Sequence, residues 1–176
     1  MAMTDKTRLE ADRLSLRALR ATDAAKIADL ANDLDIVRMT GSMPFPFSLA
    51  DAEALIVRGH GMDLARERLF AIETGEDGLV GTLGFYDTGS FGPELGYWLG
   101  RPYWGRGYAT EAAASASQWA HDEWEKAVVV AGHFADNPAS GVVLCKAGFL
   151  YTGEVQMHAS KARPELSPSR MMVRLA

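Results

Sequence analysis

The chain has 176 residues, a mass of 19.1 kDa and a formal net charge of −5, and 48 % of its residues are hydrophobic. These values fit one globular domain over residues 1–176 and exclude a mainly disordered chain; the order of residues 1–7 is left open. The acidic balance argues against nucleic acid or a membrane as a partner. One cysteine excludes an intrachain disulfide. Because the N-terminus lacks the apolar segment of a signal peptide, we expect a soluble, cytoplasmic protein.

Two helices are predicted in the first third of the chain. Thr22 or Asp23 can cap the first helix. The apolar face expected for that helix carries Ile27, Leu30, Ala31 and Leu34. Two prolines in residues 41–47 exclude a continuous helix there. Ser48 followed by Asp51 predicts the capped start of the second helix.

The remaining elements alternate between strand and helix patterns. Strands are expected at residues 13–17, 68–73, 79–86, 94–99, 127–131, 149–155 and 171–175, and further helices at residues 108–123 and 137–147. Glycine-rich turns between the middle strands predict an antiparallel arrangement. The sequence therefore predicts a mixed α/β (α+β) domain around a largely antiparallel sheet.

A glycine-rich loop between a predicted strand and a predicted helix is the segment richest in chemistry. Gly105 and Gly107 let the backbone approach an anion closely, and the free N–H groups of a helix start bind phosphate. Arg106 adds positive charge and Thr110 a hydroxyl group. The loop lacks the Gly-Lys-Ser/Thr of the Walker motif and the third glycine of the dinucleotide fingerprint. It therefore indicates either a site for another phosphate ligand or a plain turn without a ligand.

Three segments in order carry a resemblance to a known superfamily. Residues 13–24 contain Arg-Leu-x-Leu-Arg-x-Leu followed by Thr-Asp-Ala, residues 103–112 read Tyr-Trp-Gly-Arg-Gly-Tyr-Ala-Thr-Glu-Ala, and residues 137–149 contain Asn-x-x-Ser and Lys-x-Gly-Phe. Together they resemble the GNAT superfamily of acyl-CoA N-acyltransferases. The most similar subgroup is the RimJ/RimL-like ribosomal-protein alanine N-acetyltransferases.

This resemblance implies a twisted sheet whose central strands splay to form a cleft for acetyl-CoA, the co-substrate. The residues that it assigns to acetyl-CoA are Trp98, Leu99, Trp104, Gly105, Arg106, Gly107, Tyr108, Ala109, Thr110 and Asn137. It implies a primary amine as the acceptor, either a small molecule or a protein N-terminus, and direct transfer of the acetyl group. A homodimer is expected by analogy alone.

Two residues are candidates for catalysis. A base must deprotonate the attacking ammonium group, and the resemblance implies Glu94 for this role, directly or through water. The alternative is a surface carboxylate that attracts the amine. Ser140 is the candidate proton donor to the leaving thiolate, and its alternative role is helix capping or packing. Many superfamily members carry a tyrosine at the position of Leu144, which cannot donate a proton.

The acceptor site is expected beside the proline-stiffened loop. We assign Phe45, Phe47 and Tyr97 to substrate binding, with core packing as the alternative. The four histidines show no metal-ligand spacing, so we expect no metal site. Two functions other than catalysis stay open: a catalytically silent CoA-binding sensor or interaction module, and a nucleotide-binding protein that uses the same loop.

Overall fold

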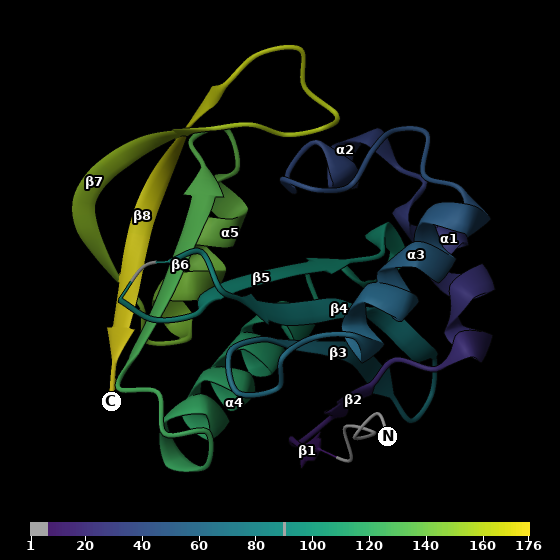
Figure 1. Cartoon of the computed structure of the whole chain (residues 1–176), viewed down its shortest axis with the longest axis horizontal. Coiled ribbons are helices and arrows are strands. Elements are labelled where there is room, and N and C mark those ends of the chain that lie inside the picture. The colour runs from purple at the N-terminus through teal and green to yellow at the C-terminus, as the bar shows by residue number, and fades with distance from the viewer. Residues whose placement is uncertain (1–6, 90) are drawn as a thin grey trace.

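The computed structural model describes residues 7–89 and 91–176, so the question of order at residues 1–7 lies almost wholly outside the described residues. These residues form an eight-stranded sheet in the order β1-β2-β3-β4-β5-β6-β8-β7 (Figure 1). Neighbouring strands pair antiparallel except β5 and β6, which are parallel. The expected largely antiparallel mixed fold is confirmed. No helix in the described part of the chain has the length and hydropathy to cross a bilayer.

The first part of the chain contains two strands and three helices. These are β1 (Arg8–Glu10), β2 (Leu14–Ala18), α1 (Ala24–Ala31), α2 (Leu34–Val37) and α3 (Leu49–His60), with a 3₁₀ turn at Ala21–Asp23. The capped start of α3 is confirmed, because the Ser48 hydroxyl accepts the Asp51 N–H at 3.2 Å while the Asp51 carboxylate accepts the Ser48 N–H at 2.8 Å.

Two expectations for the first helix are wrong. Leu34 is not part of its apolar face: it begins the separate helix α2 and is 45 % exposed. Asp23 does not cap α1 through its side chain. Its carboxylate instead accepts two hydrogen bonds from the buried Arg17 guanidinium, at 2.8 and 3.0 Å. A buried cation needs such partners, and this need overrides the local capping preference.

The second part of the chain supplies most of the sheet. It contains β3 (Arg68–Thr74), β4 (Gly78–Tyr86), β5 (Glu94–Leu99), a 3₁₀ turn (Arg101–Tyr103), α4 (Tyr108–Asp122), β6 (Val128–Phe134), α5 (Pro138–Lys146), β7 (Leu150–His158) and β8 (Ser167–Leu175). Each predicted strand and helix of this region exists. β6 and β8 are longer than expected, because polar residues extend the ladder between these two strands. His133 of β6, for example, pairs with Arg170 of β8.

The helices cover opposite faces of the sheet (Figure 1). On one face, Phe85 of β4 packs against Trp119 of α4, with ring centroids 6.4 Å apart. On the other face, Arg58 of α3 stacks on Tyr86 of β4. Because neighbouring strand residues point to opposite faces, each strand offers every second side chain to α4 and α5, and the others to α1 and α3.

The parallel pair β5 and β6 diverges along its length. The register joins only Glu94 to Val130 and Leu95 to Ala131, at the start of β5. Beyond these pairs the two strands separate, and the rest of β5 has no ladder partner on this side. The splayed central strands expected from the resemblance are therefore present, and the opening between them positions the candidate site.

Candidate active site

A cavity of about 1410 Å³ occupies the opening between β5 and β6. Its wall includes residues of β5, β6, α5, the glycine-rich loop and the segment 35–43 that contains most of α2. Ligand pockets commonly enclose about 300 to 1,000 Å³, so this cleft has room for two ligands side by side. The site is built from segments that lie far apart in the sequence.

Alternation along β5 divides the cleft into two sides. Glu94 and Trp98 pair with Tyr86 and Thr82 of β4, so they share the sheet face that α1 and α3 cover. Tyr97 points to the opposite face, where α5 lies. A group bound near Glu94 and a group bound near Tyr97 would therefore meet across a single strand.

Glu94 lies half-buried at the start of β5 and lines the cleft. Burial raises the pKa of its carboxyl above the usual range, and the positive charge of nearby His158 opposes this rise. His158 is the last residue of β7, and it also lines the cleft. A carboxylate with a raised pKa in a cleft can accept a proton from a bound ammonium group. The sequence offered no sign of His158, because only the fold brings it to Glu94.

Ser140 and Tyr97 form a hydrogen-bonded pair on the other side of the cleft. Their oxygen atoms lie 2.8 Å apart. Burial raises the pKa of Tyr97 to about 12, so its hydroxyl stays protonated near neutral pH. The side chain of Asn137 caps α5 by accepting the Ser140 N–H at 3.3 Å. Since Asn137 supplies the cap, the Ser140 hydroxyl is left to the cleft and to Tyr97.

The glycine-rich loop forms the start of α4 as expected. Gly105 and Gly107 adopt left-handed φ values of 73° and 82°, which side chains with a Cβ strongly disfavour. The loop and the first turn of α4 turn toward the cavity, which the following residues line: Trp104, Gly105, Gly107, Tyr108, Ala109 and Thr110. With the free N–H groups of the helix start, this arrangement makes an anion cradle.

Arg106 does not line the cavity with its side chain. The guanidinium lies 3.6 Å from the Asp77 carboxylate and stacks on the Tyr103 ring. Its positive charge is thus paired with Asp77, and the assignment of Arg106 to acetyl-CoA stays a prediction for its backbone N–H.

Arg13 holds the cradle in place from the start of β2. Its Nη1 donates to the Arg106 carbonyl at 2.9 Å, its Nε donates to the Glu111 carboxylate at 2.8 Å, and its guanidinium stacks on Tyr108. Its backbone N–H also donates to Glu111, at 2.6 Å. Arg13 thus ties the loop to the first turn of α4 without entering the cavity.

Replacing Arg13 by Met keeps the apolar contact with Tyr108 and removes the two side-chain hydrogen bonds. We expect the Kd for acetyl-CoA to rise about three- to tenfold, because exposed charge-assisted hydrogen bonds contribute about 1 kcal/mol. Calorimetric titration measures this change, and Arg8→Met, on the distant strand β1, is the control. An unchanged Kd in Arg13→Met would show that the loop holds its shape without this contact.

Trp98 and Leu99 lie where the strands have separated, and both line the cleft. The carbonyl of Leu99 already accepts a hydrogen bond from the Trp104 indole N–H at 2.8 Å. Trp104 also stacks under the Arg101 guanidinium. A ligand that pairs with this edge of β5 would displace the indole or use the remaining backbone groups.

Phe45 and Phe47 are not among the residues that line the cleft. Phe47 is 5 % exposed and packs in the core, while Phe45 is 47 % exposed at the surface. The structure therefore does not bring these two residues, which were predicted to bind substrate, to the cleft. The cleft is lined instead by the preceding residues 38–43. Tyr97 does line the cleft, on the side of α5.

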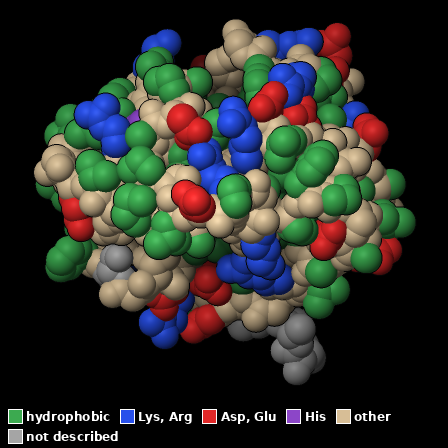
Figure 2. All heavy atoms as spheres, turned by 90° about the horizontal axis from the view of Figure 1, so that it is seen from above, with side chains coloured by type: hydrophobic (Ala, Val, Ile, Leu, Met, Phe, Trp, Pro, Cys, Tyr) green, Lys and Arg blue, Asp and Glu red, His purple; other side chains and the backbone are tan. Residues whose placement is uncertain are grey.

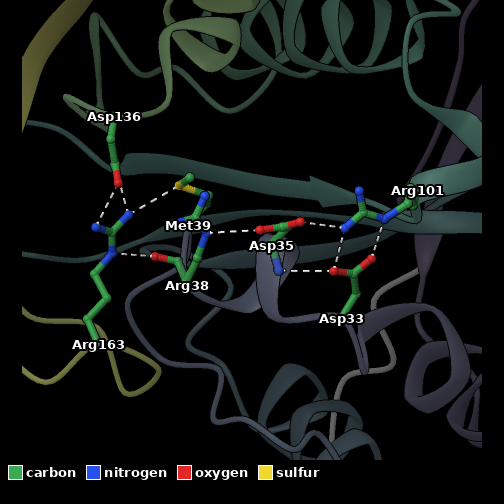
Figure 3. Close-up of polar contacts among 7 residues, drawn as sticks. All are labelled: Asp33, Asp35, Arg38, Met39, Arg101, Asp136 and Arg163. Atoms are coloured by element: carbon green, nitrogen blue, oxygen red, sulfur yellow. Dashed lines mark hydrogen bonds and ion pairs between the residues drawn. The ribbon is translucent and has the colours of Figure 1, made fainter.

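Ion pairs hold α2 across the mouth of the cleft (Figure 3). At its start, Asp33 and Asp35 each accept hydrogen bonds from Arg101, at 2.6 to 2.8 Å. After its end, the carbonyl of Arg38 accepts from Arg163 at 2.7 Å, and Arg163 also pairs with Asp136 at 2.8 Å. The face seen from above carries basic and acidic side chains intermixed across its middle (Figure 2). These contacts tie the segment 35–43, which lines the cleft, to the loops that follow β5, β6 and β7.

The comparisons with known proteins agree with this geometry. The sequence matches the acetyltransferase (GNAT) domain family over residues 13–150. It is 31 % identical over 108 residues to an uncharacterized N-acetyltransferase, p20, from Bacillus licheniformis. The aligned region covers 59 % of this chain and 60 % of that relative's length.

Solved structures show the same fold. The structure is similar to a GNAT-family acetyltransferase from Bacillus anthracis, with a TM-score of 0.82, 22 % identity and coverage of 96 % of this chain and 98 % of that chain. It is also similar to Mycobacterium smegmatis RimJ in complex with CoA-disulfide, with a TM-score of 0.84, 19 % identity and coverage of 100 % and 90 %. At these identities the likeness concerns the fold.

Proposed function

Because the chain belongs to the GNAT acetyltransferase family, we propose that it transfers an acetyl group from acetyl-CoA directly to a primary amine. The observation that carries this proposal is the cleft between β5 and β6, with an anion cradle at one end and the carboxylate of Glu94 in its wall. The amine belongs to a small molecule or to a protein N-terminus. We keep the cytoplasm as the proposed location, on the composition of the N-terminal segment, and a homodimer as the proposed assembly, on the resemblance alone.

The cradle fits the pyrophosphate of CoA. Gly105 faces open space, with no heavy atom within 4 Å of where its Cβ would be. The Trp104 N–H already donates to the Arg101 carbonyl at 3.2 Å, so the backbone N–H groups from Gly105 to Ala109 would bind the phosphate oxygens, as helix starts do elsewhere. The pantetheine arm would then run along the unpaired edge of β5 past Trp98, with Asn137 and Thr110 as further polar contacts.

We place the two proton transfers of the reaction, from the ammonium group and to the thiolate, on opposite faces of β5. Glu94, on the α3 side, takes the proton from the ammonium group, directly or through water, and the freed amine attacks the thioester carbon. A backbone N–H near Leu99 stabilises the negative charge on the carbonyl oxygen. The attached amine loses its second proton to solvent as the C–S bond breaks, and the thiolate receives a proton from the Ser140 hydroxyl. Tyr97, whose protonated hydroxyl lies 2.8 Å away, orients Ser140 and returns this proton, and solvent then re-protonates Tyr97.

Ser140→Ala should lower kcat about tenfold and change the Kd for acetyl-CoA much less, since general-acid assistance acts only in the transition state. Tyr97→Phe keeps the ring and removes the hydroxyl, so we expect a smaller fall in kcat, of about threefold. Steady-state rates and calorimetric Kd values measure both changes. Cys145→Ala, at an exposed position of the same helix that does not line this cavity, is the control for α5. Full activity of Ser140→Ala would leave Ser140 with packing alone.

The alternative function, a catalytically silent CoA-binding module, is disfavoured by the same geometry. Such a module needs the cradle, but it does not need a half-buried carboxylate on one side of β5 and a paired hydroxyl on the other. The test is the release of CoA and the mass of the acetylated product, measured with acetyl-CoA and a panel of amines and N-terminal peptides. Product whose formation depends on enzyme concentration supports catalysis. Tight acetyl-CoA binding without product from any amine would support the silent module.

A further inference from the structure

The floor of the cleft beside Glu94 is an aromatic ring laid over two glycines. Gly84 of β4 and Gly96 of β5 are directly paired across the strands. A Cβ at Gly84 would lie 2.6 Å from the Tyr86 ring, and a Cβ at Gly96 would lie 3.3 Å from it. The ring of Tyr86 therefore lies flat on the sheet, in space that side chains at these positions would fill.

Arg58 covers this ring from α3. Its guanidinium carbon lies 5.1 Å from the Tyr86 ring centroid, and both residues line the cleft. Stacking on an aromatic face orients a guanidinium while leaving its N–H edge free for oxygen ligands. Within the described residues its carboxylate partner is Glu67, at 4.0 Å, which does not line the cavity. The Arg58 side chain is 49 % exposed.

Tyr86 stands between opposite charges. Its cross-strand partner on β5 is Glu94, so the Glu94 carboxylate lies on one side of Tyr86. The Arg58 guanidinium lies over the face of the Tyr86 ring. The other charged residues on this side of the cleft are Asp35 and Arg38, which pair with each other at 3.2 Å, and His158, which faces Glu94. Among the residues that the structure describes, the acceptor side therefore offers Glu94 as an available anion and Arg58 as an available cation.

We propose that the acceptor carries a carboxylate as well as its primary amine, and that Arg58 binds this carboxylate while Glu94 receives the amine. This inference rests on the proposed function and specifies its substrate class. An acidic amino acid, or a peptide that begins with one, fits both charges. A polyamine would set its second ammonium group against Arg58, and like charges in a cleft cost affinity.

The test uses pairs of dipeptide amides that differ only in charge, Asp-Ala-amide against Asn-Ala-amide and Glu-Ala-amide against Gln-Ala-amide, with spermidine as the polyamine. We expect kcat/KM to favour the acidic member of each pair about tenfold, as a charge-assisted hydrogen bond would. In Arg58→Gln the ratio should fall to about one, mainly through KM. In Arg58→Glu the rate with spermidine should rise. Arg20→Gln removes the same charge outside the cleft and should keep the wild-type ratio.

The outcomes separate this inference from the function beneath it. Equal rates for the acidic and neutral members, unchanged in Arg58→Gln, would overturn the role of Arg58 while acetyl transfer itself stands. Failure of every acidic acceptor in a protein that still binds acetyl-CoA would also overturn it. Loss of acetyl-CoA binding in the wild-type protein would overturn the proposed function instead. Circular dichroism of Arg58→Gln checks that α3 stays folded.

Discussion

Glu94→Gln is expected to lower kcat by about 100- to 10,000-fold, the usual contribution of a general base. Glutamine keeps the size and polarity of the side chain but cannot accept the ammonium proton. Binding of acetyl-CoA should change little, because Glu94 lies on the face of β5 opposite Tyr97 and Ser140. Initial rates at saturating acetyl-CoA, with calorimetry as the control for binding, measure the effect.

The pH dependence gives this prediction a second readout. Only the ionised carboxylate acts as a base, so activity should rise with pH through the pKa of Glu94, which burial holds above its ordinary value of 4.5. His158 also lines the cleft, and a positive charge on its ring lowers that pKa. His158→Gln should therefore move the rising limb of kcat/KM to higher pH. Glu94→Gln should abolish the limb, and a limb that persists there would assign the base to another group.

Gly105→Ala is expected to weaken acetyl-CoA binding about 10- to 100-fold, as the loss of one or two hydrogen bonds to a charged phosphate would. The left-handed φ of 73° strains any residue with a Cβ, so the backbone of the cradle must shift. A Cβ there would also enter the open space in which the pyrophosphate is proposed to lie. The measurement is the Kd for acetyl-CoA.

Gly78→Ala is a matched control for this substitution. Gly78 has a φ of 68° and an equally open Cβ position, but it is the first residue of β4 and lies outside the cavity. Both variants should lose about 1 to 2 kcal/mol of folding stability from backbone strain. Only Gly105→Ala should lose affinity. Equal affinity losses in the two variants would mean that instability, rather than the cradle, causes the effect.

The local features of this fold could be predicted from the sequence because they depend on neighbouring residues. The cap at Ser48, the glycine turn before α4 and the alternation along β5 all follow from short-range rules. The Asp23 expectation was wrong because the buried Arg17 of β2 takes its carboxylate. The Leu34 expectation was wrong because α1 ends at Ala31 and Asp33 caps a separate helix.

The cleft shows the same division. Glu94, Ser140 and the cradle glycines could be named from the resemblance, and all of them line one cavity. Arg58 and His158 could not, because each reaches the cleft only through strand pairing and helix packing that join distant segments. Of the loop at residues 41–47, Gly41, Ser42 and Met43 line the cleft while Phe45 and Phe47 do not, because neither periodicity nor composition tells which side of an irregular loop faces a cleft.

Calorimetric titration of acetyl-CoA into the wild-type protein, with ATP and NAD as controls, tests the central claim most directly. That claim is that the opening between β5 and β6 is an acetyl-CoA site. We predict saturable binding of one acetyl-CoA per chain, weakened in Gly105→Ala but not in Gly78→Ala, and no comparable binding of ATP or NAD. A folded protein that does not bind acetyl-CoA, or that binds ATP or NAD as tightly, would contradict the account.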